Sequence, residues 1–319
     1  MLTRSAVLKA PGRLELAERR LELHEDEVLV KTHIAGVCGS DKMYFEGKYP
    51  PGTKLPFYLG HEGGGTVAEV GSRVSGYKPG DRVICFGWHN TFADYFAAPA
   101  ISLQPVPDGL DMTVASLGEP LGCAMFSAMQ SGLTLGDRVA VFGTGFAGLV
   151  MIQCLKKMGA SRMIAVDLID GRLEMAGKMG ADVLINPGKV DVVSAIMDKT
   201  EGKGVEVAVE AAGAEDTMNW ATASLRHNGK LVLYSWITRP VTLNISRWHQ
   251  DSFDIRATGL VHHTNEERHV WVPRILAAMT RGSVDFTSLI THEFPLEKIQ
   301  EAVETANTDP RAVKVIIRP

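Results

Sequence analysis

The stretch Arg138-Val-Ala-Val-Phe142, followed directly by Gly143-Thr-Gly-Phe-Ala-Gly148, decides the fold of this chain of 319 residues. The first part is a short apolar run typical of a buried strand, and an amphipathic helix is predicted over Ala147–Met158. A glycine-rich turn between strand and helix bends tightly and lets a phosphate group approach the N–H groups at the helix N-terminus. The stretch therefore predicts a dinucleotide-binding turn.

An acidic residue follows this turn at the spacing that ribose recognition needs. Asp167 ends the next expected strand, Arg162–Asp167, about 20 residues after the glycine turn. Its carboxylate can accept hydrogen bonds from both hydroxyls of an adenosine ribose and would repel a 2′-phosphate, so the sequence favours NAD over NADP. Arg172 is expected to pair with Asp167 or to cover the adenine. The expected cofactor-binding residues are Gly143, Gly145, Phe146, Ala147, Gly148, Asp167 and Arg172.

Strands and helices alternate through the middle of the chain. Further apolar strands are expected at Val183–Ile185, Val205–Glu210 and Lys230–Tyr234, with a helix over Gly171–Met179. This alternation predicts an α/β domain with a parallel doubly wound sheet. We expect it to span residues 121–259.

The segments on either side have a different pattern. The first 120 residues contain short strands such as Glu27–Lys31, Gly65–Val70 and Asp81–Cys85, separated by turns rich in glycine and proline. Beyond about residue 259, a helix (Val272–Arg281) and a strand (Val313–Ile317) are expected. We therefore expect a β-rich domain made of residues 1–120 and 260–319, into which the dinucleotide-binding domain is inserted.

Composition and charge argue against a nucleic-acid partner, secretion and a membrane span. The net charge is −4, from 33 basic and 37 acidic side chains, so electrostatics do not support nucleic-acid binding. Four widely spaced cysteines suit a reducing cytoplasm better than a disulfide-stabilised secreted fold. The charged N-terminal segment lacks the apolar core of a signal peptide, and no stretch is long and apolar enough for a membrane span. We expect a cytoplasmic protein that acts on a small molecule.

Three residues in the β-rich part have the chemistry of a catalytic zinc site. Cys38 lies in Gly36-Val-Cys-Gly-Ser-Asp41, His61 lies in Gly60-His-Glu-Gly-Gly-Gly65, and Glu119 precedes Pro120-Leu121. A thiolate, an imidazole and a carboxylate can hold zinc while leaving one position open for water or substrate. We expect all three on loops.

Taken together, the motifs GVCGSD, GHEGGG, EPL and the glycine turn closed by an acid resemble the zinc-dependent medium-chain dehydrogenase/reductase family. The tail Thr291-His-Glu-Phe-Pro-Leu-Glu-Lys298 is similar to that of its sorbitol and threonine dehydrogenases. The resemblance implies a GroES-like catalytic domain, a Rossmann domain, an active site in the cleft between them, and a homodimer or homotetramer. It implies these site roles: Cys38 and His61 as zinc ligands, Glu62 and Glu119 as alternative carboxylate ligands, Asp41 as partner of His61, and Ser40 as partner of the substrate oxygen.

The chain departs from the family pattern in three places. It has no CxxC motif, so we expect one catalytic zinc and no structural zinc. Met43 stands where related sequences often have the histidine that ends a proton relay. Leu260 and Val261 stand where sorbitol-type enzymes carry an Arg–Tyr pair, which argues against sorbitol itself as substrate.

The functional hypothesis is a zinc-dependent, NAD-linked oxidoreductase that interconverts a secondary alcohol and its ketone, the alcohol being a polyol, a sugar derivative or a hydroxy-amino acid. Two alternatives are a zinc-free quinone or enone reductase of the same fold and a non-catalytic nucleotide-binding protein. Glu210 is a candidate contact to the nicotinamide ribose. The candidate residues of the substrate pocket are Tyr44, Trp88, His89 and His262.

Overall fold

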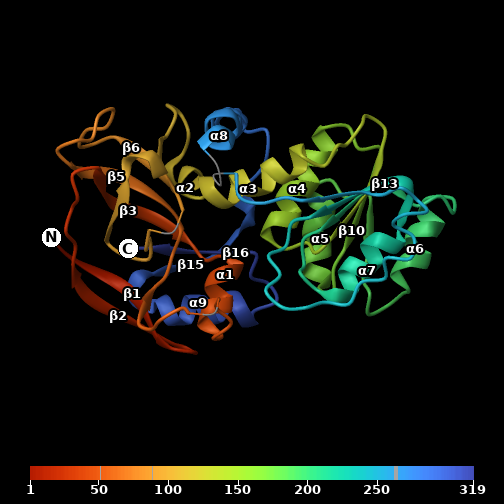
Figure 1. Cartoon of the computed structure of the whole chain (residues 1–319), viewed down its shortest axis with the longest axis horizontal. Coiled ribbons are helices and arrows are strands. Elements are labelled where there is room, and N and C mark those ends of the chain that lie inside the picture. The colour runs from red at the N-terminus through yellow and green to blue at the C-terminus, as the bar shows by residue number, and fades with distance from the viewer. Residues whose placement is uncertain (51, 88, 262–264) are drawn as a thin grey trace. The chain divides into compact units, whose positions relative to one another are not determined.

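The computed structural model describes residues 1–50, 52–87, 89–261 and 265–319, except for the side chains of residues 265–269. The chain forms two compact units. Unit 1 comprises Met1–Gly122 and Thr264–Pro319, and unit 2 comprises Cys123–His263. Figure 1 shows unit 1 assembled from both ends of the chain, red and orange from the first part and blue from the last.

Unit 2 is built on a parallel sheet. Within the described residues this sheet has six strands in the order β11-β10-β9-β12-β13-β14, and each neighbouring pair is parallel. The strands are β9 (Arg138–Phe142), β10 (Arg162–Val166), β11 (Val183–Ile185), β12 (Val205–Glu210), β13 (Leu225–Leu233) and β14 (Asp254–Ala257). The helices between them are α4 (Phe146–Lys157), α5 (Asp170–Lys178), α6 (Val192–Lys199) and α7 (Glu215–Ala223) (Figure 1). This confirms the predicted doubly wound α/β fold.

The sheet forms where the sequence predicts it because its central strands are apolar on both faces. In β9, the four residues from Val139 to Phe142 are fully buried, as a strand covered by helices on both sides requires. The strands β9, β11 and β12 have the predicted bounds. In contrast, β13 begins at Leu225, well before the predicted Lys230, because Leu225 already pairs with Val205. After a register shift, the pairing resumes at Lys230 opposite Val207.

Unit 1 is mostly β-structure. Its larger sheet has the order β15-β16-β3-β5-β6-β8, with β7 also paired to β3, and its smaller sheet has the order β2-β1-β4. The strands are β1 (Leu2–Ala10), β2 (Arg13–Arg20), β3 (Glu27–Gly36), β4 (Phe57–Tyr58), β5 (Glu62–Val70), β6 (Arg82–Phe86), β7 (Tyr95–Pro99), β8 (Leu103–Pro105), β15 (Ile290–Pro295) and β16 (Lys314–Arg318). The helices are α1 (Gly39–Phe45), α2 (Met112–Ser116), α3 (Gly118–Met129), α8 (Asn265–Thr280) and α9 (Ile299–Thr308), and the boundary with unit 2 falls within α3.

Strand pairing in the larger sheet brings four distant segments into one row. Gly36 at the end of β3 lies opposite Ile316 of β16 on one side and Glu62 of β5 on the other. Glu62 in turn lies opposite Phe86 of β6. The last strand of the chain is thus placed beside the two motifs that carry the expected metal ligands.

No helix in the described part of the chain is long and apolar enough to cross a membrane.

The pairing of β3 with β5 depends on a glycine whose replacement tests the packing of this sheet. A Cβ at Gly65 would overlap the carbonyl group of Lys31, so we expect Gly65→Ala to lower the free energy of unfolding by about 1–3 kcal/mol. At Gly171 in α5 nothing lies within 4 Å of a built Cβ, so Gly171→Ala should stay within about 1 kcal/mol of the parent. Urea unfolding measures both, and equal stability of the two variants would contradict this account.

Candidate functional site

Three side chains from two separate motifs meet in unit 1. A sulfur of Cys38, a ring nitrogen of His61 and a carboxylate oxygen of Glu62 all lie within 4.8 Å of one another. Cys38 is the N-cap of α1, His61 directly precedes β5, and Glu62 is the first residue of β5. This donor set combines the thiolate, imidazole and carboxylate ligands that zinc accepts, so the residues fit the metal that the sequence predicts.

Glu62 is fixed by a buried cation that the sequence analysis missed. Its Oε2 accepts from Nζ of Lys314 at 2.5 Å, and Nζ also donates to the carbonyl oxygen of Val37 at 3.3 Å. Lys314 is 3% exposed and Glu62 is 1% exposed. The other oxygen, Oε1, is buried and has no hydrogen-bond partner among the described residues, which leaves it available as a ligand atom. The sequence feature that could have indicated this buried cation is a lysine directly before the apolar run Val315-Ile-Ile317.

Gly36 provides the space for this carboxylate. A Cβ at Gly36 would overlap Oε2 of Glu62 and would lie 2.9 Å from a methyl group of Leu117. The first glycine of the GVCGSD motif is therefore explained by close packing against Glu62 across the sheet.

Asp41 connects the backbone of Cys38 to the ring of His61. Its Oδ2 accepts from the Cys38 N–H at 2.9 Å, and its Oδ1 lies 3.7 Å from Nδ1 of His61. Burial raises the pKa of the Asp41 carboxyl group. Burial also disfavours a charge on His61, but Cys38 and Asp41 outweigh it and raise the pKa of the ring well above its usual value. The neighbouring groups Cys38 and Asp41 thus favour a positive charge at the position of His61.

Glu119 and Ser40 complete the surroundings of His61. Glu119 is 3% exposed, and its charge contributes to the raised pKa of His61, but it does not belong to the set of atoms within 4.8 Å. It lies in the first turn of α3, so the expectation of a loop position is wrong for this residue. The Oγ of Ser40 lies 3.5 Å from Nε2 of His61, on the side of the ring opposite to Asp41.

Thr91, also missed in the sequence, supports the strand start that carries His61 and Glu62. Its Oγ1 donates to the carbonyl oxygen of Glu62 at 3.1 Å, and its N–H donates to that of Gly60 at 3.1 Å. A Cβ at Gly60, where φ is +99°, would lie 2.8 Å from Oγ1 of Thr91, and a Cβ at Gly63 would lie 2.8 Å from its Cβ. The glycines on both sides of the ligand pair therefore allow close contact with Thr91.

The candidate residues of the substrate pocket have different surroundings. Tyr44 is 9% exposed and belongs to the core of unit 1, where its ring stacks on Phe57 at a centroid distance of 5.2 Å. His89 is half-buried. Trp88 and His262 lie outside the described residues. A place in the pocket stays a prediction for all four residues.

The glycine turn of unit 2 has the shape that the sequence predicts. Gly143 has φ +94°, and a Cβ at Gly148 would overlap the carbonyl group of Gly143. Gly145 is the N-cap of α4, and nothing lies within 4 Å of a Cβ built on it, so the approach to the helix N-terminus is open. Phe146 and Ala147 form the first turn of α4.

Asp167 is oriented by the same turn. Its Oδ2 accepts from the N–H of Thr144 at 2.7 Å and from the Thr144 hydroxyl at 3.0 Å, and its Oδ1 accepts from the N–H of Ile169 at 3.0 Å. Arg172 lies in the first turn of α5, shortly after Asp167. The carboxylate therefore stands beside the glycine turn, at the carboxyl end of β10.

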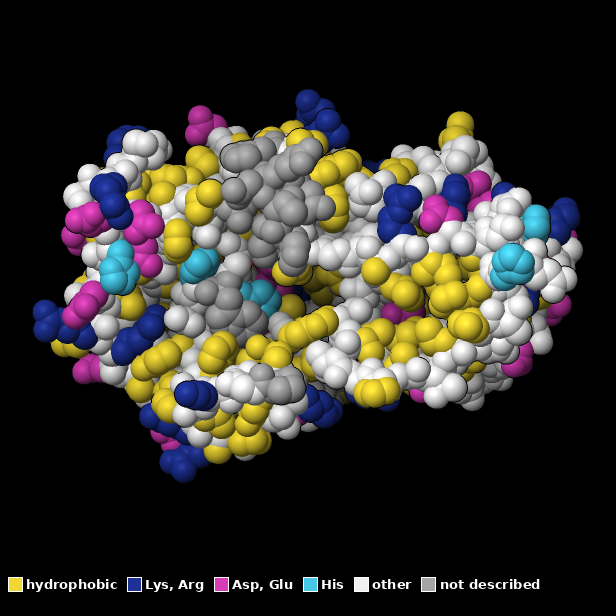
Figure 2. All heavy atoms as spheres, in the orientation of Figure 1, with side chains coloured by type: hydrophobic (Ala, Val, Ile, Leu, Met, Phe, Trp, Pro, Cys, Tyr) yellow, Lys and Arg dark blue, Asp and Glu magenta, His cyan; other side chains and the backbone are white. Residues whose placement is uncertain are grey.

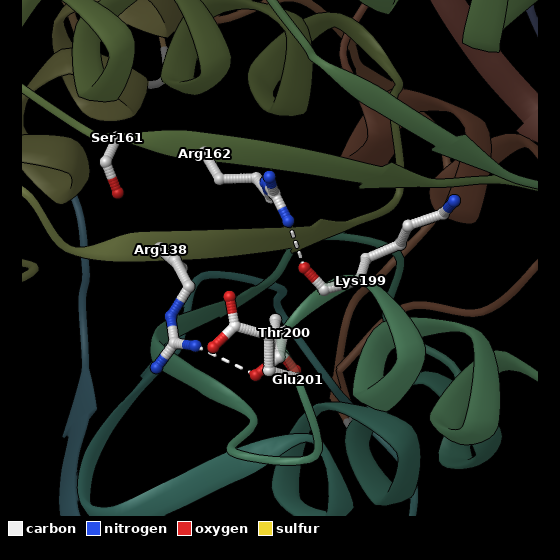
Figure 3. Close-up of a pocket in the computed structure, with 6 residues that line it drawn as sticks. All are labelled: Arg138, Ser161, Arg162, Lys199, Thr200 and Glu201. Carbon is white, nitrogen blue, oxygen red and sulfur yellow. Dashed lines mark hydrogen bonds between the residues drawn. The ribbon is translucent and has the colours of Figure 1, made fainter.

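Unit 2 has a cavity of about 220 Å³ at the amino ends of its strands, opposite to the end that carries the glycine turn and Asp167. It is bordered by Arg138 and Arg162, which begin β9 and β10, and by the end of α6. Figure 3 shows the two guanidinium groups bonded to carbonyl oxygens of Thr200 and Lys199. Because ligands of such sheets bind at the carboxyl ends of the strands, we do not place the cofactor in this cavity.

Comparison with known families gives two matches along the chain. Residues 24–108 match the alcohol dehydrogenase GroES-like domain, and residues 147–274 match the family described as zinc-binding dehydrogenase.

Individual relatives cover nearly the whole chain. The sorbitol dehydrogenase of Bacillus subtilis is 31% identical, with 93% of this chain and 92% of the relative aligned. The human sorbitol dehydrogenase is 33% identical, with 94% and 92% aligned. Among solved structures, the 2R,3R-butanediol dehydrogenase of Bacillus subtilis superposes with a TM-score of 0.88 at 25% identity, covering 99% of each chain.

The Lys314–Glu62 pair gives a stability prediction. Replacing Lys314 with methionine leaves the Glu62 carboxylate buried without its cation, and we expect a loss of about 3–5 kcal/mol in the free energy of unfolding. The double variant Glu62→Gln/Lys314→Met, which removes both charges, should recover most of this loss. Thermal and urea unfolding of the metal-free protein measure the effect. A Lys314→Met protein as stable as the parent would show that the pair does not form.

Proposed function

The chain belongs to the zinc-binding dehydrogenase family, with its GroES-like domain, and we propose that it uses one zinc ion and NAD to interconvert a secondary alcohol and its ketone. The observation that carries this proposal is the meeting of Cys38, His61 and Glu62 in one buried cluster. The names of the relatives, sorbitol and butanediol dehydrogenases, support a polyol or related hydroxyl-bearing substrate. Sugar derivatives and hydroxy-amino acids belong to the same class of substrate.

Within this proposal, Cys38, His61 and Glu62 hold the zinc, and Glu119 is the alternative carboxylate ligand. Zinc in such a site acts as a Lewis acid that lowers the pKa of the substrate hydroxyl. The Asp41 carboxylate, 3.7 Å from Nδ1 of His61, would favour a proton on that nitrogen, which leaves Nε2 for the metal. Lys314 holds Glu62 through one oxygen, and the other has no hydrogen-bond partner among the described residues and is proposed as the ligand atom.

Ser40 is proposed to take the substrate proton. Its hydroxyl lies beside Nε2 of His61, the nitrogen assigned to the metal, and so next to the position of a substrate oxygen. One turn along α1, Met43 offers no group that binds a proton, so the proton passes from Ser40 to water.

In unit 2, we propose that NAD binds over the glycine turn formed by Gly143, Gly145, Phe146, Ala147 and Gly148. NAD supplies the nicotinamide that accepts the hydride from the alcohol. The pyrophosphate would lie at the open N-terminus of α4, and Asp167 would accept a hydrogen bond from the adenosine ribose. The unit boundaries near residues 122 and 263 are proposed to separate a catalytic domain from this dinucleotide-binding domain.

We further propose a cytoplasmic homodimer or homotetramer. The edge strand β14 has no outer partner within the described chain, and such edges pair readily with a second copy. Figure 2 shows hydrophobic side chains gathered on the visible face of unit 2. All four cysteines are free, which suits a reducing compartment.

The function is tested by NADH formation over a panel of polyols, inositols, amino-sugar alcohols and threonine. We expect NADH to form with at least one substrate and NADP to be used far less well. The zinc-stripped protein and the Cys38→Ser variant should lose turnover, and Cys38→Ser should also lose zinc in elemental analysis while keeping its affinity for NADH. Full activity of the stripped protein would instead favour a zinc-free reductase.

The oligomer is tested by native mass spectrometry or light scattering of the purified protein. We expect a mass of two or four chains of 34.6 kDa, because an exposed sheet edge favours pairing with an identical edge. A single species of one chain mass at micromolar concentration would contradict the proposal.

A further inference from the structure

The topology of unit 2 fixes where the two halves of a dinucleotide would lie. In the strand order β11-β10-β9-β12-β13-β14, the direction of winding reverses between β9 and β12. Dinucleotides bind across the crevice at this switch point, with one half on each side. If NAD binds as proposed above, its adenosine half lies on the side of β10, marked by Asp167. The nicotinamide half then lies on the side of β12.

The carboxyl end of β12 carries a buried acid that the proposed mechanism does not use. Glu210 is the last residue of β12 and is 0% exposed. Its Oε1 accepts three hydrogen bonds, from the N–H of Ala212 at 2.9 Å, the N–H of Gly213 at 2.8 Å and the hydroxyl of Thr217 at 2.7 Å. The direct contact with the nicotinamide ribose expected from the sequence is therefore wrong, because the carboxylate faces its own loop and has no exposed surface.

This loop packs directly against the glycine turn. The N–H of Ala211 donates to the carbonyl oxygen of Phe142 at 2.8 Å. A Cβ at Gly143 would lie 2.8 Å from the backbone nitrogen of Ala212 and 2.9 Å from its Cβ. The shape of residues 211–214 and the shape of the turn are thus set together, one on each side of the switch point.

The second carboxylate oxygen of Glu210 is expected to destabilise the folded state. Oε2 is buried and has no hydrogen-bond partner among the described residues. A buried oxygen without a donor destabilises the folded state, so an apolar residue would suit this position better if only packing mattered. An apolar residue could not accept the three hydrogen bonds that Oε1 accepts, so these bonds are the reason for a glutamate at this position.

We propose that Glu210 is a positioning residue for the nicotinamide half of NAD. It holds residues 211–214 in the conformation that forms the β12 side of the cofactor crevice, and it acts through the loop backbone rather than by contact with the cofactor. The inference rests on the proposed function, because it assumes that a dinucleotide binds at the switch point.

The test compares two ligands, one with the nicotinamide group and one without it. Dissociation constants are measured by calorimetry for NADH, which carries the nicotinamide, and for ADP-ribose, which lacks it. We expect Glu210→Ala to weaken NADH binding about tenfold, since it removes the hydrogen bonds from the N–H groups of Ala212 and Gly213 and from the Thr217 hydroxyl. Thr217→Val should weaken it about threefold, since it removes the hydroxyl of α7 that lies within hydrogen-bond distance of both Glu210 and the Ala214 carbonyl oxygen. Both variants should leave ADP-ribose binding within about twofold of the parent. Glu210→Gln keeps an acceptor oxygen at the same reach and should retain most of the NADH affinity.

Glu206→Gln is the matched control on the same strand. Glu206 lies near the amino end of β12, where it pairs with Arg138, so this variant should lower thermal stability and leave both dissociation constants unchanged. If Glu210→Ala weakens NADH and ADP-ribose equally, or weakens neither, the positioning role is overturned. If the parent protein binds neither ligand, the proposed cofactor itself fails, and that outcome is distinct because it appears before any substitution is made.

Discussion

The buried ion pair between Lys314 and Glu62 is the interaction on which the candidate metal centre depends. Removing two charges from water costs several kcal/mol for each ion, and only close pairing with further hydrogen bonds offsets this cost. Here the 2.5 Å contact and the carbonyl group of Val37 provide that compensation. Because Lys314 begins the last strand, the chain must return to unit 1 and pair β16 with β3 before Glu62 can be charged in the interior.

The charges around this pair favour the binding of a cation at the candidate centre. Four groups that can be negative, those of Cys38, Asp41, Glu62 and Glu119, surround His61, and Lys314 is the cation bonded to the cluster in the described residues. Cys38, Asp41 and Glu119 raise the pKa of His61, which favours a proton on its ring when no metal ion is bound. A divalent ion would displace that proton, so metal binding and proton release should be coupled.

The sequence predicted the fold well because its strongest signals are local. An apolar strand, a glycine turn and an acid at the next strand end specify β9, α4 and Asp167 without knowledge of distant contacts. The sequence motifs also predicted that Cys38 and His61 share a metal site, and the family resemblance added Glu62 to it. The hydrogen bonds and the ion pair that support these residues were not predicted.

What the sequence did not predict are partners that only tertiary structure brings together. Lys314 is separated from Glu62 by most of the chain, and Thr91 is an ordinary threonine until strand pairing places it against Gly60 and Gly63. Glu119 was expected on a loop because glycine precedes it in the sequence. Proline is in fact compatible with the first turn of a helix, where its missing N–H is not needed, and Glu119 lies in that turn of α3.

The two units use a buried glutamate at a strand end in opposite ways. In unit 1, Glu62 has one oxygen bonded to Lys314 and one without a hydrogen-bond partner in the described part of the chain, and it lies close to Cys38 and His61, so its carboxylate can serve as a metal ligand. In unit 2, the hydrogen bonds to Glu210 come from the loop that follows it and from Thr217 of α7, so its carboxylate fixes the shape of this segment. A glycine allows close packing in both cases, Gly36 against the Glu62 carboxylate and Gly143 against the loop that follows Glu210. The same residue type at the end of a strand therefore gains its role from the donors that surround it.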